Sequence, residues 1–352
     1  MVKTCEISFI GNPLKVCYSG RKIFGRIVLH LDQLKTFKKL KILIYGHASV
    51  RWSTGSGKAR TTHTDNIVYL NQEIKLMKAS KQQKELILPK GSHVFHFEAE
   101  IPPNCPSSFE GSHGHIRYKV KLVFVHSILW DKAYSCPFTV INSLNLNHHG
   151  TNLWLPSKQE AVKHIYKWFK SRPLHMEVGI PKTGYVPGES IPVIINVRNE
   201  SSAKVKEICI KLALKVHCKL RYSKRSTEEK ISLTKVKTIN RKESSFDVHE
   251  IINIPATPPT LTDLCKIIQL TYSVRVEVKL AGAHTSHEIK LPIVIGVIPL
   301  GIDSYEDDSG SPPPSYKEPT YMTPALMTVD NEHEQDVSSS KFVPKYPLVS
   351  CV

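Results

Sequence analysis

The stretch FHFEAEIPPNCPSSFEGSHGHIRYKVKLVF, residues 95–124, consists of two alternating segments on either side of a proline-rich connection. In the segment HIRYKVKLVFV, residues 115–125, which begins in the second half of this stretch, apolar and polar side chains alternate and β-branched and aromatic types are frequent, as in a half-buried strand. The connection PPNCPSS is built from residues that favour turns. The stretch therefore predicts a strand, a turn and a second strand.

Strands of this kind recur through the first 300 residues. Period-two alternation is found in ILIYGHASVRW (42–52), HVFHFEAEI (93–101), EICIKLALKVHCKLRY (207–222) and YSVRVEVKL (272–280). Short strands separated by Gly, Pro, Asn and Ser clusters are typical of antiparallel β-sandwiches. The sequence therefore predicts an all-β fold.

The strand pattern also occurs twice. Ile-Pro at 101–102 precedes Tyr118 by 16 residues, counted from the proline, and Ile-Pro at 254–255 precedes Tyr272 by 17. CYSGRKIFGRIVLHL (17–31) matches GYVPGESIPVIINV (184–197), in which Pro187 and Gly188 predict a type II turn. A repeated signal indicates two copies of one sandwich.

We therefore expect four parts. They are an N-terminal sandwich (1–145), a connector (146–172), a C-terminal sandwich (173–300) and a disordered acidic tail (301–352).

The connector differs from its surroundings. LPSKQEAVKHIYKWFKSRP, residues 155–173, places Val162, Ile165 and Phe169 at helical spacing with lysines between them. This spacing predicts a short basic amphipathic turn, either lying on a membrane or packing its aromatic side chains into a neighbouring sandwich.

Charge is divided unevenly along the chain. The net charge is +17, but the tail after Leu300 has nine acidic residues and three lysines, so it carries −6 and the body +23. Such a body attracts phosphates on lipids, nucleic acid or phosphorylated tails, although lysines on exposed strand faces also serve solubility alone. The dispersed charge and the lack of an aromatic and basic RNA-binding pattern argue against nucleic acid.

Signals for catalysis and for metals are missing from the sequence. The eight cysteines have no CxxC or CxxH spacing, which argues against zinc and against a disulfide framework. GSGK (55–58) lacks the other elements of a phosphate loop, and we interpret it as a turn. Six of the histidines lie close together in pairs along the sequence, and we interpret them as exposed rather than metal-binding. These are His93, His96, His113, His115, His148 and His149. We expect no enzyme activity, metal or cofactor.

Signals for membrane insertion or secretion are missing as well. No run of 18 apolar residues and no signal peptide occur, so we expect a cytoplasmic protein.

Taken together, these stretches resemble the arrestin superfamily and, within it, the α-arrestins. The resemblance rests on the strand ending at Trp52, on PSSFEG before Gly114–Tyr118, on GYVPGESI (184–191) and on PIVIGVIPL (292–300). It implies two tandem arrestin-like sandwiches that act as a cytosolic adaptor for membrane cargo, with a tail that recruits ubiquitin ligases. KHIYKWFKS lacks the paired cysteines that α-arrestins often carry before the second domain, so a lipid anchor there is in doubt.

The tail contains short binding motifs. Pro313, Pro314 and Tyr316 form Pro-Pro-x-Tyr, a WW-domain ligand whose prolines hold polyproline II before binding. Degenerate copies at Pro319 and Tyr321, and at Pro344 and Tyr346, are candidates for secondary WW contacts, while Ser350 and Val352 fit a C-terminal PDZ ligand.

We therefore hypothesise a non-enzymatic adaptor. It would link cytoplasmic parts of transmembrane proteins to a HECT-type E3 ligase with WW domains, for ubiquitination and endocytic sorting at the plasma membrane and endosomes. The alternative is a phospholipid- or phosphopeptide-binding scaffold of a coat or retromer-like complex, and an anionic membrane surface is a further candidate partner.

Overall fold

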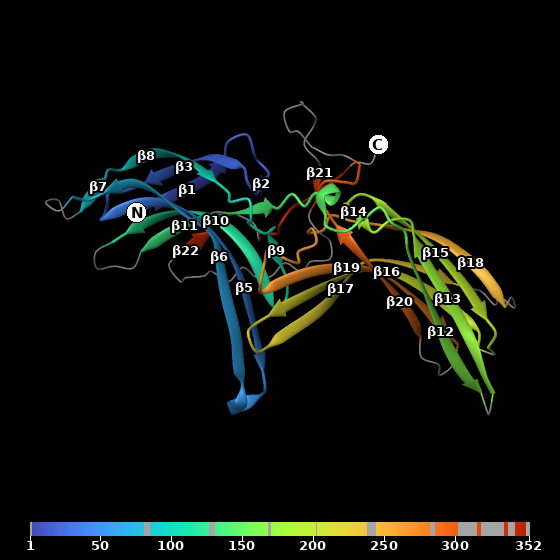
Figure 1. Ribbon diagram of the computed structural model, residues 1–352. Helices are drawn as coiled ribbons and strands as arrows, with labels where there is room; N and C mark the ends of the chain where they lie inside the picture. Colours follow the sequence, from blue (N-terminus) through green and yellow to red (C-terminus); the bar gives the residue numbers. More distant parts are fainter. Residues whose placement is uncertain are drawn as a thin grey trace.

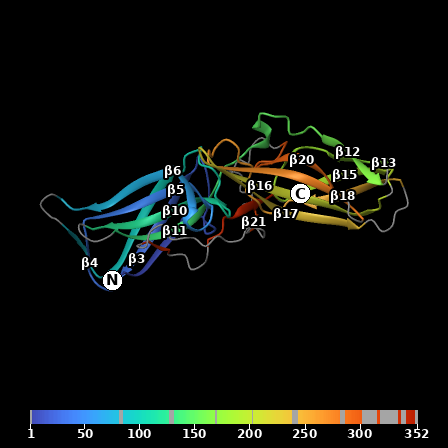
Figure 2. The same ribbon diagram turned by 90° about the horizontal axis from the view of Figure 1, so that it is seen from below.

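The computed structural model describes residues 2–80, 85–126, 131–167, 170–201, 203–237, 244–281, 286–301, 315–317, 334–336 and 342–349. These residues form almost entirely β-structure, arranged as two sandwiches that meet at a central junction (Figures 1 and 2). The predicted fold class, two tandem arrestin-like antiparallel sandwiches, is confirmed.

The first sandwich consists of two sheets. One has the strand order β1 (Val2–Phe9), β3 (Lys22–Leu31), β8 (Gly91–Glu100). The other has the order β2 (Val16–Tyr18), β11 (Lys132–Ile141), β10 (Gly114–Val125), β5 (Lys39–Thr54), β6 (Thr61–Lys78). Shorter elements are β9 (Phe109–Glu110) on β10, β22 (Glu334–Asp336) on β11, the pair β4 (Lys35–Phe37) and β7 (Leu86–Leu88), and the 3-10 turn Gly57–Ala59.

The second sandwich repeats this plan. One sheet has the strand order β12 (Ser157–Lys167), β13 (Lys170–Ile180), β15 (Ser190–Asn199), β18 (Ser245–Asn253). The other has the order β14 (Gly184–Tyr185), β20 (His287–Ile295), β19 (Ile268–Leu280), β16 (Val205–Lys219), β17 (Lys224–Lys237). The linking chain contains the 3-10 turn Leu146–His148.

The internal repeat is visible in the strand orders. Strands β13, β15 and β18 correspond to β1, β3 and β8, while β14-β20-β19-β16-β17 corresponds to β2-β11-β10-β5-β6. In both copies the short strand, β2 or β14, pairs in parallel with the final strand. The two matched tyrosines are equivalent: the hydroxyl of Tyr118 donates to the carbonyl of Pro106 at 2.7 Å, and that of Tyr272 to the carbonyl of Pro258 at 2.6 Å. The predicted duplication is confirmed.

Alternation determines which side chains form the core. Along β19 every second residue, from Ile268 to Leu280, is buried. Inward-facing aliphatic side chains of both sheets fill each sandwich, so the hydrophobic effect selects the strand register.

The predicted helical turn in the connector is wrong. Residues 157–167 form β12, which pairs antiparallel with β13 along its whole length. Ile165 is buried on this strand, whereas Val162 points outward and is exposed; Phe169 lies outside the described residues. The expected connector, 146–172, therefore contains the first strand of the second sandwich.

Part of the expected disordered tail is packed against the body. Residues 342–349, including β23 (Tyr346–Leu348), are partly or fully buried, and β23 pairs with β21 (Ser315–Lys317). The loose chain expected after residue 300 therefore does not include this segment.

Candidate functional site: the C-terminal segment at the domain junction

The segment Phe342–Val349, here called the C-terminal segment, contacts both sandwiches. The amide of Lys345 donates to Oγ1 of Thr139 on β11 at 3.1 Å. The amide of Val349 donates to the carbonyl of Pro187 in the second sandwich at 2.9 Å. The segment therefore bridges two domains that are linked elsewhere by the chain before β12.

Tyr346 is the central anchor of this segment. Its side chain is 0% exposed, and its hydroxyl donates to the carbonyl oxygen of Ser108 at 2.8 Å. Burying an aromatic side chain removes about 150–250 Å² from water, and the polar hydroxyl needs a partner once it is buried. The Ser108 carbonyl provides that partner.

The residues around Ser108 hold this acceptor in place. The amide of Ser108 donates to the carbonyl of Val140 at 2.7 Å, and the amide of Val140 donates to Oγ of Ser108 at 2.9 Å. Close by in sequence, Nε and Nη2 of Arg117 donate to the two carboxylate oxygens of Glu110 at 2.6 and 2.9 Å, and both side chains are buried. The PSSFEG stretch therefore forms a rigid corner against which Tyr346 packs.

The GYVPGE turn provides the second anchor point. The amide of Glu189 donates to the carbonyl of Val186 at 3.1 Å, and Gly188 has φ +102°, so the predicted type II turn is confirmed. A Cβ on Gly188 would lie 2.2 Å from the carbonyl oxygen of Val349. Glycine is thus required here both for the turn and for the close approach of the C-terminal segment.

The Pro-Pro-x-Tyr motif ends in a strand that pairs with this segment. In the antiparallel pair β21–β23, Ser315 lies opposite Leu348, Tyr316 opposite Pro347 and Lys317 opposite Tyr346. The remaining predicted motif residues, Pro313, Pro314, Pro319, Tyr321, Ser350 and Val352, lie outside the described residues. Of the degenerate copy VPKY, both Pro344 and Tyr346 are buried, so a WW domain cannot reach them while the segment is in place.

A cavity of about 750 Å³ lies beside the C-terminal segment. Pro347 and Val349 form part of its wall, and residues of the stretches 9–14, 16–19 and 21–24 line most of the rest. The lining combines apolar side chains with the ionisable side chains of Tyr18, Arg21 and Lys22, a combination found in ligand-binding cavities.

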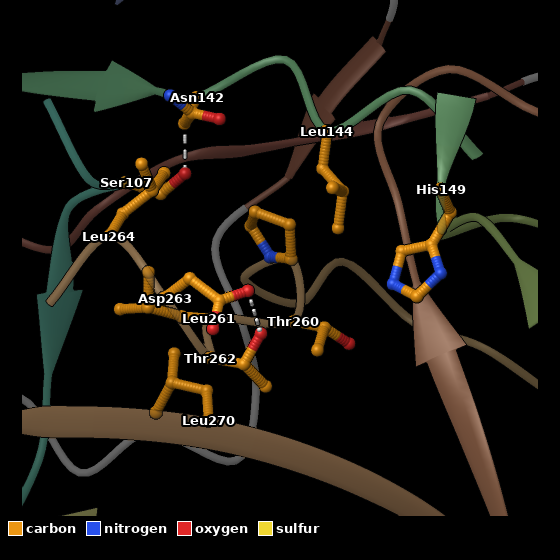
Figure 3. Close-up of a pocket in the computed structure, with 11 residues that line it drawn as sticks. Ser107, Asn142, Leu144, His149, Thr260, Leu261, Thr262, Asp263, Leu264 and Leu270 are labelled. Atoms are coloured by element: carbon orange, nitrogen blue, oxygen red, sulfur yellow. Dashed lines mark hydrogen bonds between the residues drawn. The ribbon is translucent and has the colours of Figure 1, made fainter. Parts of the chain in front are cut away.

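A second, smaller cavity of about 100 Å³ lies at the junction of the sandwiches (Figure 3). Two pairs of polar groups around this cavity are hydrogen-bonded to each other. The main-chain N–H of Asn142 donates to Oγ of Ser107 at 2.8 Å, and the Thr262 hydroxyl donates to the Asp263 carboxylate at 3.0 Å. The first bond lies within the first sandwich and its following chain, and the second lies in the connection between β18 and β19 of the second sandwich.

Histidines and cysteines provide no reactive centre in the part of the chain that the structure describes. No group of three metal-binding side chains occurs there. The predicted exposure of the histidines is confirmed for His96 and His148 only, because His93, His113, His115 and His149 are partly buried. Burial raises the pKa of the Cys17 thiol to about 12, so this thiol is protonated at neutral pH and is a poor nucleophile.

Two further sequence interpretations can be compared with the structure. GSGK lies in the connection between β5 and β6, where Gly57–Ala59 form an exposed 3-10 turn, as interpreted. Among the described residues, no helix has the length and apolarity needed to cross a bilayer.

Comparison with known proteins agrees with this architecture. Residues 5–147 match the family model "Arrestin (or S-antigen), N-terminal domain", and residues 170–300 match "Arrestin (or S-antigen), C-terminal domain". The chain belongs to the arrestin family.

Similar arrestin-family proteins share most of this chain. Arrestin domain-containing protein 17 of Caenorhabditis elegans is 29% identical over 84% of this chain and 70% of its own length. Arrestin domain-containing protein 4 of Mus musculus is 26% identical over 81% and 70%, and arrestin domain-containing protein 1 of Homo sapiens is 27% identical over 81% and 62%. The arrestin body is therefore the shared part.

Sequence reasoning missed the docking of this arrestin's C-terminal segment. The pattern VPKY predicts a degenerate WW ligand, because a proline and a tyrosine stand in it at the spacing of such ligands. A second signal was present: Phe342, Val343, Tyr346 and Leu348 are apolar in an otherwise acidic tail. Such a cluster is typical of a segment that packs against a folded domain.

Proposed function

We propose that this arrestin is a non-enzymatic adaptor. Its sandwiches bind cytoplasmic parts of transmembrane cargo, and Pro313, Pro314 and Tyr316 bind a WW domain of a HECT-type ubiquitin ligase. The complex directs ubiquitination and endocytic sorting of the cargo, so the protein works in the cytoplasm and on the surfaces of the plasma membrane and endosomes. The observation that carries the proposal is a Pro-Pro-x-Tyr motif, 313–316, joined to an arrestin body.

The chemistry of the motif supports ligase recruitment. Adjacent prolines favour polyproline II in the free chain, so little conformational entropy is lost on docking into an aromatic groove. The tyrosine two positions later supplies an amphipathic aromatic anchor. The rigid body and the motif can then act on different partners at the same time.

A pulldown with an isolated WW domain tests the proposal. The full chain should be retained, and Tyr316→Ala should lose retention. The matched control is Tyr321→Ala, in the degenerate copy, which should be retained like the unaltered chain. Retention of Tyr316→Ala at the level of the unaltered chain would contradict the ligase-recruitment proposal.

A second candidate function is binding to anionic phospholipid or to phosphopeptides in a coat or retromer-like scaffold. The charge of +23 on residues 1–300 favours it. Sedimentation with phosphatidylserine vesicles over a salt series separates it from the first. Strong, salt-sensitive binding that persists in Tyr316→Ala supports the scaffold, whereas absence of vesicle binding at low salt rejects it.

A further inference from the structure

We propose that the C-terminal segment is an intramolecular clasp that pairs with Ser315–Lys317, where the Pro-Pro-x-Tyr motif ends, and lowers the affinity of the motif for WW domains. The inference rests on the proposed function of residues 313–316. It identifies Tyr346 as the residue that anchors the C-terminal segment beside the motif and so hinders binding of a WW domain.

Strand pairing and WW binding need different surroundings for the same residues. A WW ligand binds as polyproline II, a conformation without internal hydrogen bonds, with its tyrosine in a groove. In the structure Tyr316 lies in β21, opposite Pro347 of β23. Paired strands lie about 4.8 Å apart, so β23 occupies space beside Tyr316 that a WW domain must enter.

The clasp is fixed to the body and not only to the motif. Tyr346 is fully buried and bonded to Ser108, Lys345 is bonded to Thr139, and Val349 is bonded to Pro187. These contacts lie on both sandwiches, so β23 is held at the junction of the folded body. The body therefore supplies the free energy that keeps β23 beside the motif.

A separate strand pairing also ties the tail to the first sandwich. Strand β22 pairs in parallel with Ala133–Ser135 of β11, and Figure 1 shows β22 against the first sandwich and β21 near the junction. The tail carries −6 and the body +23, so electrostatic attraction adds to the pairing.

Mass action gives the size of the effect. When only a fraction of the molecules is open, the apparent Kd equals the intrinsic Kd divided by that fraction. A clasp open in about one molecule in ten thus weakens WW binding about tenfold. Opening by substitution should restore the intrinsic affinity.

The test compares Kd values for one isolated WW domain that binds Pro-Pro-x-Tyr peptides. The ligands are a synthetic peptide of residues 309–321, the full chain, and full chains with Tyr346→Ala or Tyr222→Ala. Tyr222 is the matched control because it is a tyrosine that is 87% exposed. We expect the full chain and Tyr222→Ala to bind about tenfold more weakly than the peptide, and Tyr346→Ala to bind like the peptide.

The outcomes separate the clasp from the proposed function. A full chain that binds as tightly as the peptide overturns the clasp and leaves ligase recruitment intact. Equal weak binding of Tyr346→Ala and the full chain overturns the role of Tyr346. A peptide that does not bind overturns the proposed function and the clasp with it.

Folding of the variants is checked separately. Tyr346→Phe keeps the ring and removes the hydroxyl that bonds to Ser108, so it should fold and bind with a Kd between those of the full chain and Tyr346→Ala. Thermal unfolding of each variant reports whether the sandwiches remain intact. Tyr346→Phe binding more weakly than the full chain would contradict the clasp.

Discussion

The hydroxyl of Tyr346 donates a hydrogen bond to the carbonyl oxygen of Ser108, 238 residues earlier in the chain. This bond places the C-terminal segment on the corner that Arg117 and Glu110 stabilise. The same segment pairs with the strand that contains Tyr316. Folding of the arrestin body and access to the ligase-binding motif are therefore physically connected.

Removal of this hydroxyl should loosen the C-terminal segment. In Tyr346→Phe the Ser108 carbonyl loses a partner, and a hydrogen bond of this kind contributes about 0.5–1.5 kcal/mol. Amide hydrogen exchange at Lys345 and Val349 should become about two- to tenfold faster, because opening becomes more frequent. The control Tyr222→Phe should leave both exchange rates unchanged. Unchanged rates in Tyr346→Phe would show that the bond to Ser108 does not hold the segment.

Loss of the buried ion pair should destabilise the first sandwich strongly. Arg117→Ala leaves the Glu110 carboxylate buried without its bidentate partner, a change that costs about 3–5 kcal/mol. Urea unfolding followed by fluorescence measures the loss. The control is Lys22→Ala, which breaks the exposed pair with Glu98 and should leave the midpoint nearly unchanged. Equal effects of the two variants would show that burial of the pair does not matter.

A side chain at Gly46 should disturb the PSSFEG corner by pushing on Tyr118. A Cβ there would lie 2.2 Å from the Tyr118 ring, whose hydroxyl is bonded to Pro106. Gly46→Ala should cost about 1–3 kcal/mol by overpacking. Gly179→Ala, another substitution within a strand, has its nearest contacts at 4.0 Å and should be close to neutral in the same denaturation assay. A neutral Gly46→Ala would mean that the Tyr118 ring moves freely.

Stability should fall at alkaline pH in a way that depends on the buried thiols. Burial raises the pKa of Cys17 from 9.0 to about 12, so the unfolded state ionises first as the pH rises. The contribution of the Cys17 thiol to the free energy of unfolding is therefore fully present below pH 9 and is lost as the pH rises from about 9 to 12. Urea midpoints at pH 8 and 11 should differ less for Cys17→Ala than for the unaltered chain. Identical differences would show that this thiol ionises equally in both states.

The sequence was sufficient for the body of this arrestin and insufficient for its junction. Alternation and the matched Tyr118 and Tyr272 predicted two sandwiches, because side-chain burial follows a period of two in strands. The spacing of Val162 and Ile165 predicts a helical turn in the segment 155–173, but pairing with β13 makes residues 157–167 a strand, and the sequence spacing alone does not contain that pairing. Docking of Tyr346 could not be predicted, because its partner is the main-chain carbonyl of Ser108, and every residue has such a carbonyl.

Binding of a WW domain to the motif should in turn release the C-terminal segment. If the clasp and the WW domain compete for Tyr316, linkage requires that each weakens the other by the same factor. A WW domain at saturating concentration should therefore speed amide exchange at Lys345 and Val349, by about the ratio of the Kd values of full chain and peptide. Exchange in the β19 core, at Val274 and Val276, is the internal control and should not change. Unchanged exchange at Val349 with the WW domain bound would show that the motif and the segment are independent.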